Sequence, residues 1–344
     1  MGFNLLQSCS KLWLPSLSSQ YLDGDRFYLF LYRYDVFHKV IALVNQEKSR
    51  YGQQLVTEQR IGLTVNEDSE SELTTARLHQ IKYACEKLLM LHGYEINEDV
   101  VGYKYCFTTK SHGKINENVH RYVCGVVNNS AMKTKETDLT CEMYKQQKMI
   151  VLDKLNEEKA VDSDERKAWL ESITEAIVIF EFLSVKPSCS ISVTDSNKSI
   201  TNEKSGVFVL YNAARIRAIL EKFREGQLSG IYPELWDFHR IDFTKLHSQE
   251  EWEIVYHYLL EYPELIKKSV KHELKHEIYP NLICSFLISL CKKFSKFYRK
   301  ERILTDGSEH LIPTMMARVW LLKSIQIVMT NCMHILGINE VTKM

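Results

Sequence analysis

The order of apolar and polar residues predicts a mixed α/β arrangement in the first part of the chain. Residues 26–34 are rich in aromatic side chains, which favours a strand, and residues 36–46 carry apolar side chains at helical spacing. Residues 55–65 alternate between apolar and polar side chains, which predicts another strand. A helix is expected after Ser69, which opens a Ser-x-x-Glu capping box, and Gly93 is suited to end it.

From about residue 139 the pattern becomes helical. The strongly apolar stretch 169–183 predicts a buried helix, and the polar stretch 195–205 predicts a linker or loop. Beyond it the pattern contains helices and no convincing strand. Ser248 begins a second capping box, and Gly337 ends the last helix. The second part is therefore expected to be an all-α domain.

One helix in that second part has an unusual charge distribution. On a helical wheel of about 100° per residue, residues 283–302 separate into two faces. The apolar face carries Ile283, Phe286, Leu287, Leu290, Phe294 and Phe297, and the opposite face carries Lys292, Lys293, Lys296, Arg299 and Lys300. Residues 265–304 contain ten Lys/Arg against three Asp/Glu, an excess of seven positive charges in a chain of zero net charge.

Two interpretations fit this basic helix. A solvated face would keep an amphipathic helix soluble, but such faces usually mix both signs because opposite charges at i,i+4 stabilise the helix. A single-sign stripe beside the ring of Tyr298 favours nucleic-acid binding, since cations hold phosphates while a base stacks on the ring.

The composition of the whole chain bears on its electrostatic function and on the cellular compartment that we expect. Lys+Arg and Asp+Glu balance at 44 each, so any electrostatic function must be local. The nine cysteines include no Cys-x-x-Cys pair and predict a reducing compartment, so we expect a cytoplasmic protein. We expect no secretory signal peptide at the start of the chain, and no membrane span, because the sequence has no run of about 18 apolar residues.

The stretch 272–276, His-Glu-Leu-Lys-His, matches the H-E-x-x-H signature of zinc proteases. Lys271 and Lys275 disfavour that interpretation, because two cations beside Zn²⁺ raise the cost of binding it, and no third ligand follows at a familiar spacing. No Ser/His/Asp or Cys/His set and no glycine-rich S-adenosylmethionine loop is evident. We therefore expect no metal, no cofactor and no catalytic residue.

The end of the chain carries a family resemblance. The stretch ARVWLLKSIQIVMTNCMHILGINEVTKM, residues 317–344, resembles the last helix of arginyl-tRNA synthetases. Three stretches before it agree in order with the same family: LYNAARIRAIL, LEYPELIKKSVKHELKHEIYPNLICSFLISL and KFSKFYRKERIL. Together they imply that residues 205–344 form a helical anticodon-binding domain of the DALR type, although the DALR tetrapeptide itself is absent.

The resemblance continues more weakly upstream. Residues 71–96 are similar to the region of class I synthetases that carries the His-x-Gly-His signature, which Ala76-Arg77-Leu78-His79 replaces here. Residues 128–140 occupy the place of the Lys-Met-Ser-Lys loop and keep Lys133 and Lys135. Both elements hold ATP phosphates in that family, so their degeneration implies that amino-acid activation fails.

The implied fold class is therefore α/β plus all-α. A truncated class I synthetase-like α/β part is followed by a C-terminal all-α helical bundle of the DALR anticodon-binding type. The implied division is an N-terminal α/β region at 1–70, a degenerate, shortened Rossmann-like region at 71–200, and the helical DALR domain at 205–344.

Within that superfamily the chain resembles the animal family of DALR anticodon-binding-domain-containing protein 3. The stretches GDRFYLFLYRYDVFHKVIALV, KSGVFVLYNAARI, IYPELWDF, HSQEEWEIVYHYLLEYPELI and ICSFLISLCKKFSKFYRKERIL carry that likeness. The resemblance implies a non-catalytic tRNA-binding adaptor. Such an adaptor brings arginine tRNAs to a methyltransferase that makes 3-methylcytidine in the anticodon loop. The alternatives are a protein-interaction scaffold without RNA binding, and an active arginine–tRNA ligase.

Candidate tRNA-binding residues come from two sources. The positions that match the family are Tyr211, Arg215, Tyr298 and Met344. Of these, Tyr298 is expected to stack on a base, and Arg215 either contacts RNA or pairs within the fold. Charge alone assigns Lys292, Lys296, Arg299 and Arg302 to RNA phosphates, which fix position without reading sequence.

Overall fold

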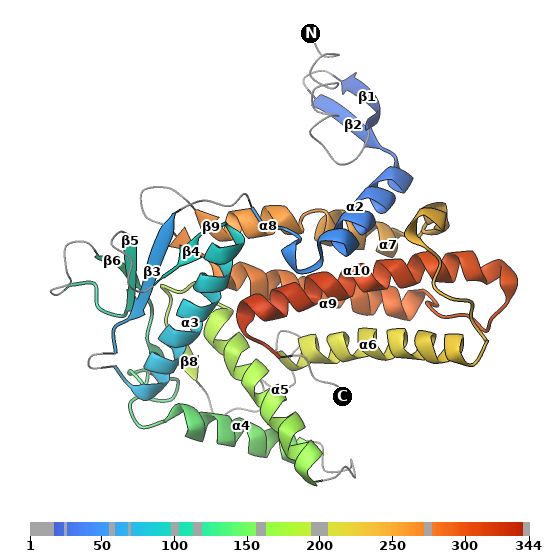
Figure 1. Ribbon diagram of the computed structural model, residues 1–344. Coiled ribbons are helices and arrows are strands. Elements are labelled where there is room, and N and C mark those ends of the chain that lie inside the picture. Colours follow the sequence, from blue (N-terminus) through green and yellow to red (C-terminus); the bar gives the residue numbers. More distant parts are fainter. Residues whose placement is uncertain are drawn as a thin grey trace. The chain divides into compact units, whose positions relative to one another are not determined.

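The computed structural model describes residues 17–23, 26–54, 59–67, 70–97, 103–112, 119–155, 163–193, 206–271 and 277–339 (Figure 1). The chain divides into two compact units, each assembled from segments distant in sequence. Unit 1 comprises residues 1–51, 215–262 and 292–329, and unit 2 comprises residues 52–214, 263–291 and 330–344. The three-part division by sequence remains a prediction.

Unit 2 contains a parallel four-stranded sheet in the order β4-β3-β5-β6. Its strands are β3 (Arg60–Val65), β4 (Glu95–Ile96), β5 (Tyr103–Thr108) and β6 (Val119–Val123). The helix α3 (Glu72–Leu91) connects β3 to β4 and packs on β3, β4 and β5 (Figure 1). The strand order changes direction between β3 and β5. This part of the chain is therefore α/β, as its hydrophobic pattern predicts.

Two further helices and a small parallel ladder complete the segment 52–214 of unit 2. The ladder joins β7 (Val127–Asn129) to β8 (Ile191–Val193). Between them lie α4 (Cys141–Leu155) and α5 (Ser163–Leu183), which pack on each other. Glu181 of α5 accepts hydrogen bonds from Tyr144 Oη at 2.5 Å and Lys148 Nζ at 3.0 Å of α4, so the polar atoms at this contact are paired.

Unit 1 begins with an antiparallel hairpin of β1 (Leu17–Asp23) and β2 (Arg26–Leu31), followed by α2 (Arg33–Glu47). Along α2 the residues Val36, Phe37, Val40, Ile41 and Val44 are buried, a spacing that gives the helix one apolar face. Asn45 of α2 donates to Ser324 Oγ at 2.7 Å. A short helix, α7 (Gln249–Ile254), continues into a π-helical turn, Val255–Leu259, which contacts α2.

The remaining long helices are α6 (Gly206–Leu228), α8 (Tyr262–Ser269), α9 (Pro280–Lys300) and α10 (Ile312–Leu336). The division between the two units falls within each of them. Three-residue 3₁₀ turns lie at Lys48–Arg50, Phe238–Arg240, Phe243–Lys245 and Glu309–Leu311. Gly337, at a φ of 77° that favours glycine, ends α10 as predicted.

The structure corrects two sequence predictions. The helix α3 begins at Glu72 with Ser71 as its N-cap, so the capping box expected at Ser69 is wrong, and Ser69 lies outside the described residues. The helical part of the chain also contains two short strands, β9 (Val270–Lys271) and β10 (Glu277–Ile278), which pair antiparallel. The hydrophobic pattern misses strands of two residues because they have no measurable period.

Two predicted features lie outside the described residues. They are the polar linker at 195–205 and the H-E-x-x-H stretch at 272–276.

One helix meets the length and hydropathy of a membrane span, which the sequence analysis did not anticipate. It comprises Glu309–Leu336, with a mean hydropathy of 1.3 over its most apolar window. The structure buries 67% of that window, as expected of a core helix. Among the described residues, no other helix meets both criteria.

Candidate nucleic-acid interface

The last three turns of α9 in unit 1 have one apolar and one basic face. Phe294 and Phe297 are fully buried, whereas Lys292, Lys296, Arg299 and Lys300 are exposed. This agrees with the helical wheel, because side chains three or four residues apart share a face. The inward rings therefore fix the direction in which the cations point.

The short helix α7 lies beside this part of α9, and a capping box fixes its first turn. Ser248 Oγ accepts a hydrogen bond from Glu251 N at 3.2 Å, and Glu251 Oε2 accepts one from Ser248 N at 2.9 Å. The box predicted at Ser248 is therefore confirmed. It sets where α7 begins, and with it the positions of Glu250, Glu251 and Glu253.

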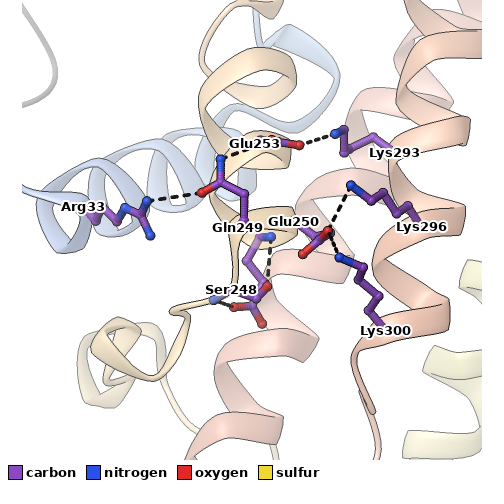
Figure 2. Close-up of polar contacts among 9 residues, drawn as sticks. Arg33, Ser248, Gln249, Glu250, Glu253, Lys293, Lys296 and Lys300 are labelled. Carbon is purple, nitrogen blue, oxygen red and sulfur yellow. Dashed lines mark hydrogen bonds and ion pairs between the residues drawn. The ribbon is translucent and has the colours of Figure 1, made fainter.

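Two of these glutamates pair with lysines of α9 (Figure 2). Glu250 Oε1 lies 3.1 Å from Lys296 Nζ and 2.6 Å from Lys300 Nζ, and Glu253 Oε2 pairs with Lys293 Nζ. Hydrogen bonding to Lys300, and then to Lys296, lowers the pKa of Glu250 to about 2. Hydrogen bonding to Lys293 lowers the pKa of Glu253. Both carboxylates therefore remain charged at neutral pH.

The same short helix is also tied to α2. Gln249 Oε1 accepts a hydrogen bond from Arg33 Nη2 at 3.4 Å, and Gln249 Nε2 donates to Glu253 Oε1 at 3.1 Å (Figure 2). The guanidinium of Arg33 lies 5.0 Å from the ring centroid of Trp252, within the range of a cation–π interaction. Contacts on both sides thus hold α7 between α2 and α9.

The third glutamate of α7 belongs to a buried charge network. Arg318 of α10, only 8% exposed, donates from Nε to Glu251 Oε1 at 2.8 Å and from Nη2 to Glu301 Oε2 at 2.5 Å. Its Nη1 donates to the carbonyl of Arg302 at 2.8 Å. Because each polar group has a partner, the network fastens the end of α9 to α7 and α10 without leaving an unpaired buried charge.

The structure brings together two residues that the sequence proposed separately. Tyr298 of α9 is 41% exposed, and the guanidinium carbon of Arg215 of α6 lies 4.7 Å from its ring centroid. The ring also lies 6.3 Å from that of Phe294. Arg215 therefore pairs within the fold, the second of its two expected roles, and forms part of a partly exposed aromatic–cationic surface.

The other candidate residues have different surroundings. Tyr211, which is 47% exposed, lies one turn before Arg215 on α6. Lys292 and Arg299 are exposed on α9, and the exposed Arg302 just beyond it donates from Nε to the carbonyl of Leu304 at 3.1 Å. Met344 lies outside the described residues. The assignment of these side chains to RNA contacts remains a prediction.

The sequence analysis missed the acidic partners of the basic helix. Glu250 and Glu253 pair with three of the cations counted on α9, namely Lys293, Lys296 and Lys300, and offset two of their three charges. The sequence does contain these counter-charges, in the run QEEWE at 249–253. They lie outside the stretch 265–304 over which the charge was counted. Counting charge over a local window overstates a basic face when its counter-charges come from another helix.

A second cluster lies at the carboxyl ends of β3 and β5 in unit 2, where strand order changes direction. Glu70, with a side chain only 3% exposed, accepts hydrogen bonds from Thr109 Oγ1 and from Lys135 Nζ, the latter at 2.6 Å. This edge is where open α/β sheets usually bind ligands. Here the carboxylate is already paired with two protein side chains.

The stretch 76–79, which the resemblance places at the class I signature, makes contacts within the fold. Arg77 is fully buried and donates to the carbonyls of Phe182 at 3.2 Å, Gly125 at 2.6 Å and Cys189 at 2.8 Å. Burial lowers the pKa of Arg77 to about 10, so the guanidinium remains charged at neutral pH. His79, two residues later, is exposed and lies 2.7 Å from Glu67 Oε1. No group of three or more metal-ligating side chains occurs in the described ranges.

Comparison with known proteins agrees with this architecture. Residues 209–344 match the DALR anticodon binding domain family. The chain is 29% identical over 217 residues to a Danio rerio protein named DALR anticodon-binding domain-containing protein 3, a match that covers 59% of this chain and 38% of that protein. It is 30% identical over 168 residues to the arginine–tRNA ligase of Clostridium kluyveri, covering 48% of this chain and 26% of the ligase.

Among solved structures, the Thermus thermophilus arginyl-tRNA synthetase matches 91% of this chain and 58% of its own, with a TM-score of 0.53 and 13% identity. That likeness establishes the fold alone. The chain spans well under half the length of the curated relatives it matches. Residues 209–344 thus match the DALR anticodon binding domain family, within a chain whose fold resembles that of an arginyl-tRNA synthetase.

Proposed function

We propose that this chain is a non-catalytic, cytoplasmic tRNA-binding adaptor. It recognises arginine tRNAs and delivers them to a methyltransferase that makes 3-methylcytidine in the anticodon loop. The observation that carries the proposal is the partly exposed Tyr298–Arg215 pair, within the residues that match the DALR family and next to exposed cations of α9. The arginine specificity and the methyltransferase partner rest on the resemblance described above.

The chemistry of this surface suits a single-stranded loop. A base splayed out of an anticodon loop can stack on the exposed ring of Tyr298 or on the guanidinium plane of Arg215. Lys292 and Arg299 project from the same helix and can bind neighbouring phosphates. Stacking and phosphate contacts are the two components by which proteins usually hold single-stranded RNA.

The absence of catalysis is proposed from the α/β unit. Arg77, in place of the class I signature, is engaged with three backbone carbonyls and cannot also bind a nucleotide phosphate. Lys135, in the place of a mobile catalytic lysine, is paired with the buried carboxylate of Glu70. These contacts hold the two segments in structural roles.

The test is equilibrium binding of arginine tRNA across a series of salt concentrations. Removing two cations in Lys292→Gln/Arg299→Gln should weaken binding to every tRNA and reduce the salt slope by about two, one for each phosphate contact. The matched control, Lys267→Gln/Lys268→Gln, removes two exposed cations from α8 and should leave both quantities unchanged. Equal effects of the two double variants would contradict a binding face on α9.

The variant Tyr298→Ala tests base recognition rather than charge. Loss of a stacked base should weaken arginine tRNA binding by about 1–3 kcal/mol with no change in the salt slope. Unrelated tRNAs should be affected less. To test delivery, RNA and proteins that co-purify with the chain are identified, and arginine tRNAs enriched together with a 3-methylcytidine methyltransferase are the expected result.

A protein-interaction scaffold is the second candidate, and one observation favours it. Three lysines of the basic helix are already paired with glutamates of the same unit, as a solvated structural face would be. This candidate predicts no tRNA affinity at physiological salt, so the binding experiment separates it from the adaptor.

A further inference from the structure

Two carboxylates lie directly behind the lysines of α9. Lys296 and Lys300 share one oxygen of Glu250, at 3.1 and 2.6 Å, and Lys293 pairs with Glu253 (Figure 2). Three ammonium groups therefore face two carboxylates, which leaves one excess positive charge in the cluster. The lysine stripe is much less basic than its sequence indicates.

Glu250 is much less exposed than the two lysines with which it pairs, whereas Glu253 and Lys293 are about equally exposed. The side chain of Glu250 is 6% exposed, whereas those of Lys296 and Lys300 are 48% and 55% exposed. A phosphate that approaches from solvent would thus meet the ammonium groups first, with the carboxylate beneath them. It would be attracted by the lysines and repelled by Glu250 at only slightly greater distance.

These carboxylates are fixed parts of the fold. The capping box holds the start of α7, and Glu251 of the same turn is fully buried against Arg318. Gln249 donates to Glu253 and accepts from Arg33 on the other side. The backbone that carries both glutamates is therefore held in place, which keeps their carboxylates beside the lysines.

We infer that Glu250 and Glu253 are fixed counter-charges that limit how strongly α9 binds RNA phosphates. The inference rests on the proposed function and concerns the same surface. A lysine that is already paired releases fewer counterions from RNA, so it adds less to sequence-independent affinity. Recognition then depends more on the partly exposed Tyr298–Arg215 pair, because phosphate contacts carry no sequence information.

The test replaces each carboxylate by its neutral amide in Glu250→Gln and Glu253→Gln. Removing one negative charge within several ångströms of a bound phosphate should tighten tRNA binding about three- to tenfold at 0.1 M salt. Arginine and unrelated tRNAs should gain alike, and the salt slope should steepen by about one for each lysine released to a phosphate.

The matched control is Glu95→Gln. It removes the same charge and breaks the 2.9 Å ion pair with Arg60 in the sheet of unit 2, so it should change neither affinity nor slope. Glu253→Gln is the gentler of the two test variants, because Glu253 pairs with one lysine and its side chain is partly exposed. It keeps the test decisive if Glu250→Gln fails to fold, which thermal unfolding checks.

Unchanged or weaker tRNA binding by a folded variant would overturn the inference, since a weaker complex means that the carboxylates orient the lysines instead. Either result is measured relative to tRNA binding by the wild-type protein. The proposed function therefore survives even if the inference fails. A wild-type protein that binds no tRNA would overturn the proposed function, and the inference with it.

Discussion

At the scale of single residues, the same side-chain type has opposite roles in this chain. Arg77 is fully buried and satisfies three carbonyls, whereas Arg299 is exposed on the basic face of α9. Arg215 falls between them, with a guanidinium that lies on a partly exposed ring. Sequence alone cannot separate these cases, because burial and partners come from segments distant in the chain.

Replacing Arg77 by Met should destabilise the fold strongly. The change leaves the buried carbonyls of Phe182 and Gly125 and the part-buried carbonyl of Cys189 without this donor. Each unsatisfied buried group costs about 1–3 kcal/mol, so a loss of about 2 kcal/mol or more in the free energy of unfolding is expected. Urea denaturation measures it. His79→Gln, two residues away, is the control: it removes one exposed contact to Glu67 and should cost at most about 1 kcal/mol. Similar losses for both variants would show that the carbonyl contacts of Arg77 contribute little.

The candidate site was predictable only in part at this scale. Family positions and charge singled out Tyr298, Arg215 and the cations of α9, and the structure brings Tyr298 and Arg215 into contact. Neither Glu250 nor Arg318 was foreseen, because each acts through partners on another helix. Charge complementarity between QEEWE and the lysines was present in the sequence, but only the fold pairs them.

At the scale of elements, α7 is too short to be stable alone, since isolated helices below about 12 residues are marginal in water. The stability that its helix propensity does not provide comes from its capping box, its ion pairs to α9 and the Glu251–Arg318 pair. The basic helix α9 thus depends on a six-residue neighbour for the placement of its lysines.

Ser248→Ala should therefore weaken more than one contact. Loss of the cap to Glu251 N is expected to cost about 1 kcal/mol in the free energy of unfolding, whereas Ser248→Gly should cost only about a few tenths, because glycine suits the cap backbone. Urea denaturation of both variants gives the comparison. A loss below about 0.3 kcal/mol for Ser248→Ala would mean that tertiary contacts alone fix the start of α7.

Long elements were predictable and short ones were not. The helices α9 and α10 begin and end close to the positions that periodicity and Gly337 indicate. The capping box at Ser248 is present, whereas a similar pattern at Ser69 is not used, because the chain enters α3 two residues later at Ser71. A capping motif makes a helix start possible at that position, and the packing of the helix decides where the helix begins.

At the scale of the whole molecule, a fold that resembles that of an arginyl-tRNA synthetase carries a parallel sheet with a paired carboxylate at its carboxyl edge. Glu70 accepts hydrogen bonds from Thr109 and Lys135 at the carboxyl ends of β3 and β5. The overall fold class was predictable, since strands and helices alternate before residue 139 and helices with only short strands follow it. The assembly of each compact unit from three separate segments was not, because local periodicity carries no information about distant contacts.

This arrangement leads to a prediction for the intact chain. Arginine-dependent ATP–pyrophosphate exchange should stay at background, because Arg77 and Lys135 are engaged within the fold. An arginyl-tRNA synthetase assayed alongside provides the positive control. Exchange above background that requires arginine would contradict the proposed absence of catalysis and restore the ligase alternative.

The buried rings of α9 have a consequence for the kinetics of complex formation. Phe294 and Phe297 prevent the helix from rotating about its axis, so its outer side chains already point outward before any partner arrives. Docking to such a preformed surface needs no ordering of the backbone. The association rate should then be set by diffusion and electrostatic steering, and should fall steeply as ionic strength rises.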